Sequence, residues 1–519
     1  METASFSRSY KSYLAQKATD KSAPIMRTIA KTFDYIDGGF LDPESLFLCD
    51  SVPLMDVPDF IRDYLNDHTL PQNFYTHVNG DSLLVDALEI QGQAHDLYYH
   101  DAENILIGNG AMNVFSALSH ALCDPGDVLL TFSPTYILLA GCVQANGAEL
   151  RVVESVYHPE SGFKVTPEAL DIAVAQCRRE GRNVKGLLIV NPTNVDGQYW
   201  TEDEIESVQD SIVRNDLIVI EDRVYINMCF DQGKRRPAFF ANNKVLQDRV
   251  ITMDSASKRY GATQFRVGWA YGPKDIIDVA RDYTMNSIWS GNARFQRATA
   301  LALYADLPKD HPDPKNPDPK SKELYELGRK HANNARNYNE KLLEGYKYRR
   351  DLCLLIINGK TKYEELAREH NLFGVNTLLK FYQEALSRFH IDLEGIPGFN
   401  TPLISRATMF MLIELDKSLF EDMSLVTDDK DQLFHRLLHA ETKVVLLPPS
   451  ENTLPENERF YRMEYGVKLD HLLESLRRIQ KFMRAWTAKS KNQIQQDIIY
   501  SYKCLPDKYK NKDNTLKAA

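Results

Sequence analysis

The sequence predicts an α/β fold with a mostly parallel central sheet, helices on both faces of that sheet, and a smaller α+β domain. Between about residues 104 and 271, short apolar runs alternate with amphipathic segments. This is the pattern of strand–helix–strand units with right-handed crossovers. The length of 519 residues and the hydrophobic content of 43% allow two domains with sizeable cores.

Composition excludes several classes of function. A net charge of −10 argues against broad nucleic-acid binding and against an anionic membrane surface. The most apolar stretch, 128–145, is interrupted by Pro134 and predicts no membrane span. Seven dispersed cysteines without a Cys-x-x-Cys pair predict reduced thiols and a cytoplasmic chain, and no cysteine–histidine cluster has the spacing of a metal site. The charged N-terminal segment does not read as a signal peptide.

Five parts are expected along the chain. They are an N-terminal arm with part of the small domain (1–74), a large domain (75–300), a linker helix with an inserted helical segment (301–400), a C-terminal small domain (401–487) and a polar tail (488–519). Within the third part, 306–322 is rich in Pro, Asp and Lys and predicts an extended, exposed loop. One long amphipathic helix is expected over 323–350, followed by a helical pair over 361–400.

The first strand of the large domain is expected at 104–107, and a helix then runs to about Leu122. Free N–H groups where this helix begins, at Gly110, Ala111 and Met112, favour a phosphate. The Gly-x-Gly pattern here also resembles a dinucleotide fingerprint, but Asn113 takes the place of the third glycine.

The next strands each end in polar or aromatic residues. The strand at 128–132 precedes Tyr136, which begins the next helix and could stack on a planar ring. A strand at 186–190 ends in a turn that contains Asn194. The strand at 217–220 is followed by a carboxylate and a phenol that could face one pocket, Asp222 and Tyr225. Alternatively, Asp222 could be an ordinary surface ion-pair partner.

The stretch from Asp254 to Gly268 joins the buried run 250–253 to the apolar run 267–271. Two hydroxyls, one amine and one guanidinium converge there, which is what a site needs to hold a phosphate and to present an amine to a carbonyl. These groups belong to Ser255, Ser257, Lys258 and Arg266. Ligands of open parallel sheets bind beyond the carboxyl ends of the strands, so we expect these groups to meet Asn194 and Asp222.

The C-terminal domain is expected to contain strands at 408–415, 443–447 and 460–466 and a helix at 469–486. Arg462 lies in the third strand. Its planar fork could bind a carboxylate through two hydrogen bonds, or it could be a solvent-exposed strand residue.

Taken in order, these stretches resemble the class I/II aminotransferases, the fold-type-I pyridoxal-phosphate enzymes of the aspartate aminotransferase superfamily. The family's lysine motif, Ser-x-Ser-Lys followed by Gly-x-Arg-x-Gly, is matched except that Gln264 replaces the first glycine. Its Asn-Pro-x-Asn-Pro-x-Gly motif is matched except that Val195 replaces the second proline. The resemblance covers roughly residues 45–300 and a patch near 462.

The resemblance implies a pyridoxal 5′-phosphate cofactor held by Lys258 as a Schiff base, with Lys258 also acting as general base. It implies that Asp222 faces the pyridine nitrogen, that Asn194 and Tyr225 contact the 3-oxygen, and that Tyr136 stacks on the ring. The phosphate would be bound by Ser255, Ser257, Arg266 and the N–H groups of Gly110, Ala111 and Met112.

For the substrate, the resemblance implies that Arg462 holds the α-carboxylate, beside Asn194. Ser51 stands where the family carries a glycine next to the substrate. Tyr75 would reach the cofactor phosphate of a partner subunit, which implies a homodimer with shared active sites. Asn286 occupies the place of an arginine found in dicarboxylate-specific members, which argues against an aspartate-type pocket built in the usual way.

The expected function is therefore transfer of an amino group between an amino acid and a 2-oxo acid. Other fold-type-I reactions share the cofactor residues, and the length of the chain resembles that of an aspartate 4-decarboxylase; a β-lyase or an oxidase also stays open. A non-catalytic binding or regulatory protein with the same fold is a further alternative. A dehydrogenase would leave Lys258 and Arg266 unexplained.

Overall fold

The computed structural model describes residues 44–49, 51–67, 75–136, 138–230, 236–311, 318–419, 430–449, 453–454 and 459–489, with single residues between 492 and 500. The expected N-terminal arm up to residue 43 and most of the expected polar tail lie outside these ranges. Among the described residues, no helix is both long enough and apolar enough to cross a membrane.

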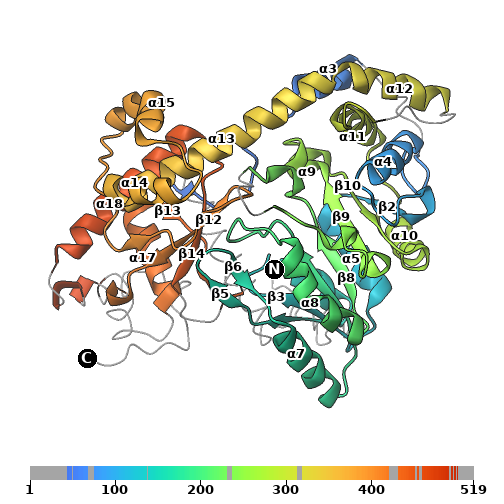
Figure 1. Cartoon of the computed structure of the whole chain (residues 1–519), viewed down its shortest axis with the longest axis horizontal. Coiled ribbons are helices and arrows are strands. Elements are labelled where there is room, and N and C mark those ends of the chain that lie inside the picture. Colours follow the sequence, from blue (N-terminus) through green and yellow to red (C-terminus); the bar gives the residue numbers. More distant parts are fainter. Residues whose placement is uncertain are drawn as a thin grey trace, which may run out of the picture.

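A seven-stranded sheet forms the centre of the large domain (Figure 1). Every neighbouring pair is parallel except those of β10, which is antiparallel to both of its neighbours. The strands, in spatial order, are β2 (Ile105–Gly108), β10 (Gly268–Tyr271), β9 (Val250–Ser255), β8 (Ile218–Asp222), β7 (Val184–Val190), β3 (Val128–Phe132) and β4 (Glu149–Val153). The predicted mostly parallel α/β fold is confirmed.

Alternate residues of each strand enter two different cores, so both faces of the sheet are covered. Leu188 packs on one face, whereas Leu187 and Ile189 pack on the other. The first face is covered by α5 (Ala111–Leu122), α6 (Leu139–Ala145) and α10 (Lys274–Ile288). The second is covered by α4 (Ser82–Ala94), α7 (Pro167–Arg179), α8 (Glu202–Arg214) and α11 (Ala293–Asp306).

A separate hydrophobic core holds the C-terminal domain together. Its antiparallel sheet has the order β11 (Phe399–Asn400), β12 (Phe410–Leu415), β14 (Phe460–Glu464), and it is flanked by α17 (Lys430–Thr442) and α18 (Leu469–Thr487). An early part of the chain joins this domain, because β1 (Leu46–Phe47) pairs in parallel with β13 (Val444–Val445).

The helices between the two domains differ in part from the expectation. The single helix predicted over 323–350 is two helices, α12 (Pro319–Lys330) and α13 (Ala332–Asn358), which meet at His331. In the last turn of α12, Gly328 lies so close to α11 that a Cβ there would be 2.5 Å from the Tyr304 Cβ. α12 therefore packs along α11, whereas α13 extends to the C-terminal domain and packs in its hydrophobic core (Figure 1). The predicted helical pair is present as α14 (Lys360–Glu369) and α15 (Val375–Arg388).

Two further expectations were wrong in detail. Asp306 was placed in an exposed loop, but it ends α11, and Leu307 after it is buried. Tyr136 was expected to begin a helix, but α6 begins at Leu139.

The remaining short elements connect these parts. They are α3 (Asp59–Asp67), the hairpin of β5 (Val156–His158) and β6 (Gly162–Lys164), and the 3-10 turns Ala102–Asn104, Ile226–Met228, Phe240–Asn242, Gln247–Arg249 and Thr263–Phe265.

Candidate active site

A cavity of about 350 Å³ lies at the carboxyl ends of β3, β7, β8 and β9. Eleven of the side chains singled out from the sequence line it: Ser51, Ala111, Met112, Tyr136, Asn194, Asp222, Tyr225, Ser255, Ser257, Lys258 and Arg266. This is the edge of an open parallel sheet where ligands bind.

Lys258 lies in the short helix α9 (Ala256–Arg259), which follows β9 directly. Its amine donates a hydrogen bond to the carbonyl oxygen of Ser51. Burial lowers the pKa of Lys258 to about 8, and the positive charges of Arg462 and Arg266 act in the same direction. A lysine with a lowered pKa has a larger fraction of neutral, nucleophilic amine near neutral pH.

Asp222 ends β8 and is buried. Burial raises the pKa of its carboxyl group to about 7, and the nearby Asp254 acts in the same direction. The backbone N–H of Val224 donates to Oδ1 at 3.1 Å. Because a cation beside a buried carboxyl favours its ionised form, Asp222 is suited to face a protonated ring nitrogen.

A hydrogen-bonded chain joins the two domains at the wall of the cavity. Arg462 Nη1 donates to Asn194 Oδ1 at 2.7 Å, and Asn194 Nδ2 donates to Tyr225 Oη at 3.3 Å. The other end of the guanidinium donates to the carbonyl oxygen of Cys49 at 2.8 Å, and its flat face lies 4.4 Å from the ring centre of Phe410. Arg462 is thus held rigidly at the site, although it does not appear in the cavity lining.

The start of α5 forms the other end of the cavity, next to Arg266. Gly110, the N-cap of α5, has φ +82, and a Cβ there would lie 2.8 Å from the Arg266 Cζ. The guanidinium of Arg266 donates to the carbonyl oxygens of Thr263 at 3.2 Å and Asn109 at 3.4 Å. The helix N-terminus and the guanidinium together make a cradle for an anion, with the hydroxyls of Ser255 and Ser257 nearby.

One acidic residue of the site was missed in the sequence. The buried carboxylate of Glu464 accepts a hydrogen bond from the Ser51 backbone N–H at 2.6 Å, and Ser51 itself has φ +60. The period of two along the predicted strand at 460–466 could have shown that Glu464 shares a face with Arg462.

Tyr75 is not part of the cavity. Its side chain is 87% exposed, and its ring lies 6.1 Å from that of Trp289. In the described part of the chain, no group of three or more His, Cys, Asp or Glu residues is arranged to hold a metal ion.

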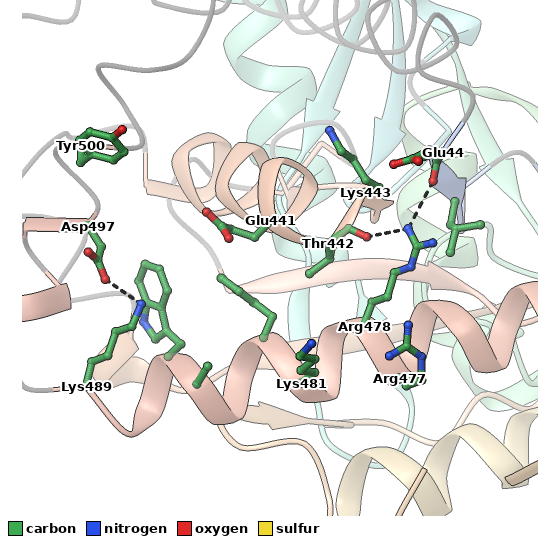
Figure 2. Close-up of a pocket in the computed structure, with 14 residues that line it drawn as sticks. Glu44, Glu441, Thr442, Lys443, Arg477, Arg478, Lys481, Lys489, Asp497 and Tyr500 are labelled. Atoms are coloured by element: carbon green, nitrogen blue, oxygen red, sulfur yellow. Dashed lines mark hydrogen bonds and ion pairs between the residues drawn. The ribbon is translucent and has the colours of Figure 1, made fainter. Parts of the chain in front are cut away.

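A larger cavity of about 940 Å³ lies in the C-terminal domain, between α17, β13 and α18 (Figure 2). Two of its basic side chains already have partners: Arg478 donates to the carbonyl oxygens of Glu44 and Thr442, and Lys489 pairs with Asp497 at 2.7 Å. None of the side chains predicted to act in catalysis lines it. The smaller cavity is the better candidate, because the buried lysine and aspartate with shifted pKa values face it.

The mostly parallel sheet, the lysine after β9 and the aspartate at the end of β8 agree with the resemblance to fold-type-I aminotransferases. The family model for aminotransferase class I and II matches residues 71–311. The members of that family use pyridoxal phosphate.

Several curated relatives are named aminotransferases or transaminases. The chain is 30% identical over 232 residues to the probable N-succinyldiaminopimelate aminotransferase DapC of Mycobacterium tuberculosis, which covers 44% of this chain and 56% of the relative. It is 26% identical over 277 residues to kynurenine–oxoglutarate transaminase 3 of Mus musculus, covering 52% of this chain and 60% of the relative. The match thus spans little more than half the length of these relatives.

Solved structures show the same fold over more of the chain. The N-succinyldiaminopimelate aminotransferase of Mycobacterium tuberculosis has a TM-score of 0.64 at 22% identity, covering 88% of this chain and 99% of the other. The aspartate aminotransferase of Rhizobium meliloti has a TM-score of 0.65 at 17% identity, covering 92% of this chain and 98% of the other.

Proposed function

We propose that this chain is a pyridoxal-phosphate-dependent aminotransferase that moves an amino group between an amino acid and a 2-oxo acid. The observation that supports it most strongly is a buried amine and a buried carboxyl group that line one cavity, Lys258 and Asp222, with Arg462 hydrogen-bonded to Asn194 in the cavity wall. The match of the family model over residues 71–311 supports the same reaction.

The residues present fit the cofactor. The anion cradle suits its phosphate, the amine of Lys258 suits its aldehyde, and the buried Asp222 carboxyl suits its ring nitrogen, because a protonated nitrogen would favour the ionised carboxylate and oppose the effect of burial on the Asp222 pKa. The Asn194 amide and the Tyr225 hydroxyl would contact the ring oxygen, and Tyr136 would lie on the ring. Bound pyridoxal phosphate supplies an electron-withdrawing ring that lets the α-carbon lose a proton.

Side chains of this chain would bind the substrate, transfer the proton and exclude water. Arg462 holds the substrate carboxylate through its planar fork, and its bonds to Asn194 and Cys49 fix its direction before substrate binds. Lys258, with a pKa of about 8, would take the proton from the substrate α-carbon and return it at the cofactor carbon on the other side of the amino nitrogen. The buried wall made by Tyr225 and Val190 keeps water from competing for that proton.

Among the described residues, neither Asn286, at the expected place of a second arginine, nor Arg294 or Arg297 lines the cavity. Asn286 donates to the carbonyl oxygen of Asp282 on the exposed side of α10. Arg297 is paired with Asp81 at 2.8 Å, and Arg294 donates to the carbonyl oxygen of Leu65. We therefore propose that the substrate carries one carboxylate, unless a partner subunit supplies a second cation.

We also propose a cytoplasmic homodimer with shared active sites. No disulfide joins any of the six described cysteines. Tyr75 is highly exposed in the single chain and available to a second copy. Light scattering would show the dimer, and mixing inactive Lys258→Ala and Tyr75→Ala chains should restore part of the activity if the sites are shared.

The test is borohydride reduction of the chain with pyridoxal phosphate, followed by peptide mass spectrometry. The reduced adduct should lie on Lys258, and Lys258→Ala should give none. Incubation with a panel of amino acids and 2-oxo acids should then yield a new amino acid and a new 2-oxo acid in equal amounts. Release of carbon dioxide or ammonia instead would replace transamination by a decarboxylase or lyase reaction. A chain that binds no cofactor would refute the proposal and leave a non-catalytic role.

A further inference from the structure

Glu464 lies two residues after Arg462 in β14 and is fully buried. Side chains alternate along a strand, so both residues project from the same face of β14. The backbone N–H of Glu464 donates to the carbonyl oxygen of Leu48 at 2.8 Å, which brings the segment after β1 alongside. An acid and a guanidinium therefore stand next to each other at the wall of the cavity.

The carboxylate of Glu464 holds a turn in an unfavourable backbone conformation. Its Oε2 accepts the Ser51 N–H at 2.6 Å, a short hydrogen bond assisted by charge. Ser51 has φ +60, in the left-handed region that residues other than glycine rarely adopt. The carbonyl oxygen of the same residue accepts the hydrogen bond of the Lys258 amine. Glu464 thus reaches Lys258 through a single residue.

Glu464 and Lys258 also interact electrostatically. The amine of Lys258 is faced by two acids and two guanidinium groups from three parts of the chain: Glu464 and Arg462 on β14, Asp222 on β8 and Arg266 before β10. Burial lowers the pKa of Lys258, and Glu464 is the strongest of the opposing charges. Its negative charge counteracts the two arginines that the anion cradle and the carboxylate site require.

We propose that Glu464 is a positioning residue for Lys258, which fixes the Ser51 turn that orients the amine and balances the positive charges around it. The inference rests on the proposed function for the reaction that Lys258 serves, but the contacts themselves lie within this chain. Under this proposal, Glu464 keeps the Lys258 amine oriented and offsets the positive charges of a site that binds anions.

Two variants separate the two effects. Glu464→Gln keeps an oxygen for the Ser51 N–H and removes the charge, whereas Glu464→Asp keeps the charge and is too short for the hydrogen bond. Glu414→Gln is the matched control, because it removes the same charge from the adjacent strand β12, where Glu414 pairs with Arg459 at 2.7 Å. Thermal unfolding checks that each full-length variant is folded.

The first readout needs no cofactor. The full-length chain is freed of any cofactor with hydroxylamine, and the acylation of Lys258 by acetic anhydride is followed against pH by mass spectrometry. The wild-type midpoint is expected near pH 8. Glu464→Gln should shift it down by about one pH unit, since loss of a nearby negative charge disfavours the ammonium form. Glu414→Gln should not shift it.

The second readout is the rate at which pyridoxal phosphate forms the borohydride-trapped adduct. Glu464→Asp should slow it about tenfold or more, because the amine is no longer held in place. An unchanged acylation midpoint in Glu464→Gln overturns the proposal, and so does a wild-type adduct rate in Glu464→Asp. Because acylation is measured without cofactor, a chain that never forms the adduct contradicts the proposed function and leaves the acylation result to decide on Glu464.

Discussion

Replacing Gly110 by alanine should damage the anion cradle while leaving the fold intact. The glycine has φ +82 and ψ 166, a conformation that costs other residues about 1–3 kcal/mol. The added methyl group would also lie 2.8 Å from the Arg266 Cζ. Because that contact is with the end of a flexible side chain, Arg266 can move aside, so the second cost falls on ligand binding and not on folding.

A matched control is available in Gly126, which has φ +99 and nothing within 4 Å of an added Cβ. Both variants should lose about 1–3 kcal/mol of unfolding free energy in urea. Only Gly110→Ala should also weaken pyridoxal phosphate, by about 10- to 100-fold in a fluorescence titration, the value of one hydrogen bond to a charged group. If Gly110→Ala binds the cofactor as tightly as Gly126→Ala, the assignment of this cradle to the phosphate is wrong.

Three further changes have defined outcomes. Ser51→Gly should raise the unfolding free energy by about 0.5–1 kcal/mol in urea, because glycine accepts φ +60 freely; a loss of stability would contradict this. The Asp222 pKa of about 7 is raised above its unfolded value, so its contribution to stability, at most about 4 kcal/mol, is present below pH 4 and is lost as the pH rises to 7. Asp222→Asn should remove that slope from stability measured against pH in the cofactor-free chain, and an unchanged slope would count against it. Arg259→Met should lower the unfolding free energy by about 3–5 kcal/mol in urea, because it leaves the buried Asp254 and the partly buried Asp306 without their common cation; a loss below about 1 kcal/mol would show that water replaces the guanidinium.

The strand ends that carry the cavity were predictable because each follows a short, continuous apolar run. Lys258 comes after 250–253, and Asp222 comes after 217–220. The structure brings both to one cavity, as expected from the rule that parallel strands place their carboxyl ends at one edge. The roles of these residues stay predictions until the cofactor experiments are done.

Long-range polar contacts were not predictable from the sequence. Arg259 directly follows the lysine, but its partner Asp306 is 47 residues away, in a stretch whose Pro, Asp and Lys content resembles an exposed loop. Composition averages over a window, so it does not distinguish a carboxylate that is partly buried and ion-paired at the end of α11. Glu464 was overlooked for a similar reason, since a lone acid in a strand usually faces solvent.

The contacts that complete the cavity have an implication for how the chain is made. Arg462 meets Asn194 across 268 residues, and Glu464 meets Ser51 across 413. At a synthesis rate of about 5–20 residues per second, the lysine loop leaves the ribosome roughly 10–40 s before β14 does. During that interval the nascent chain has its reactive amine without the arginine and the acid that surround it in the finished protein. Completion of the cavity therefore waits for the synthesis of β14, and a ribosome stalled before residue 462 would carry the large-domain sheet with an open site.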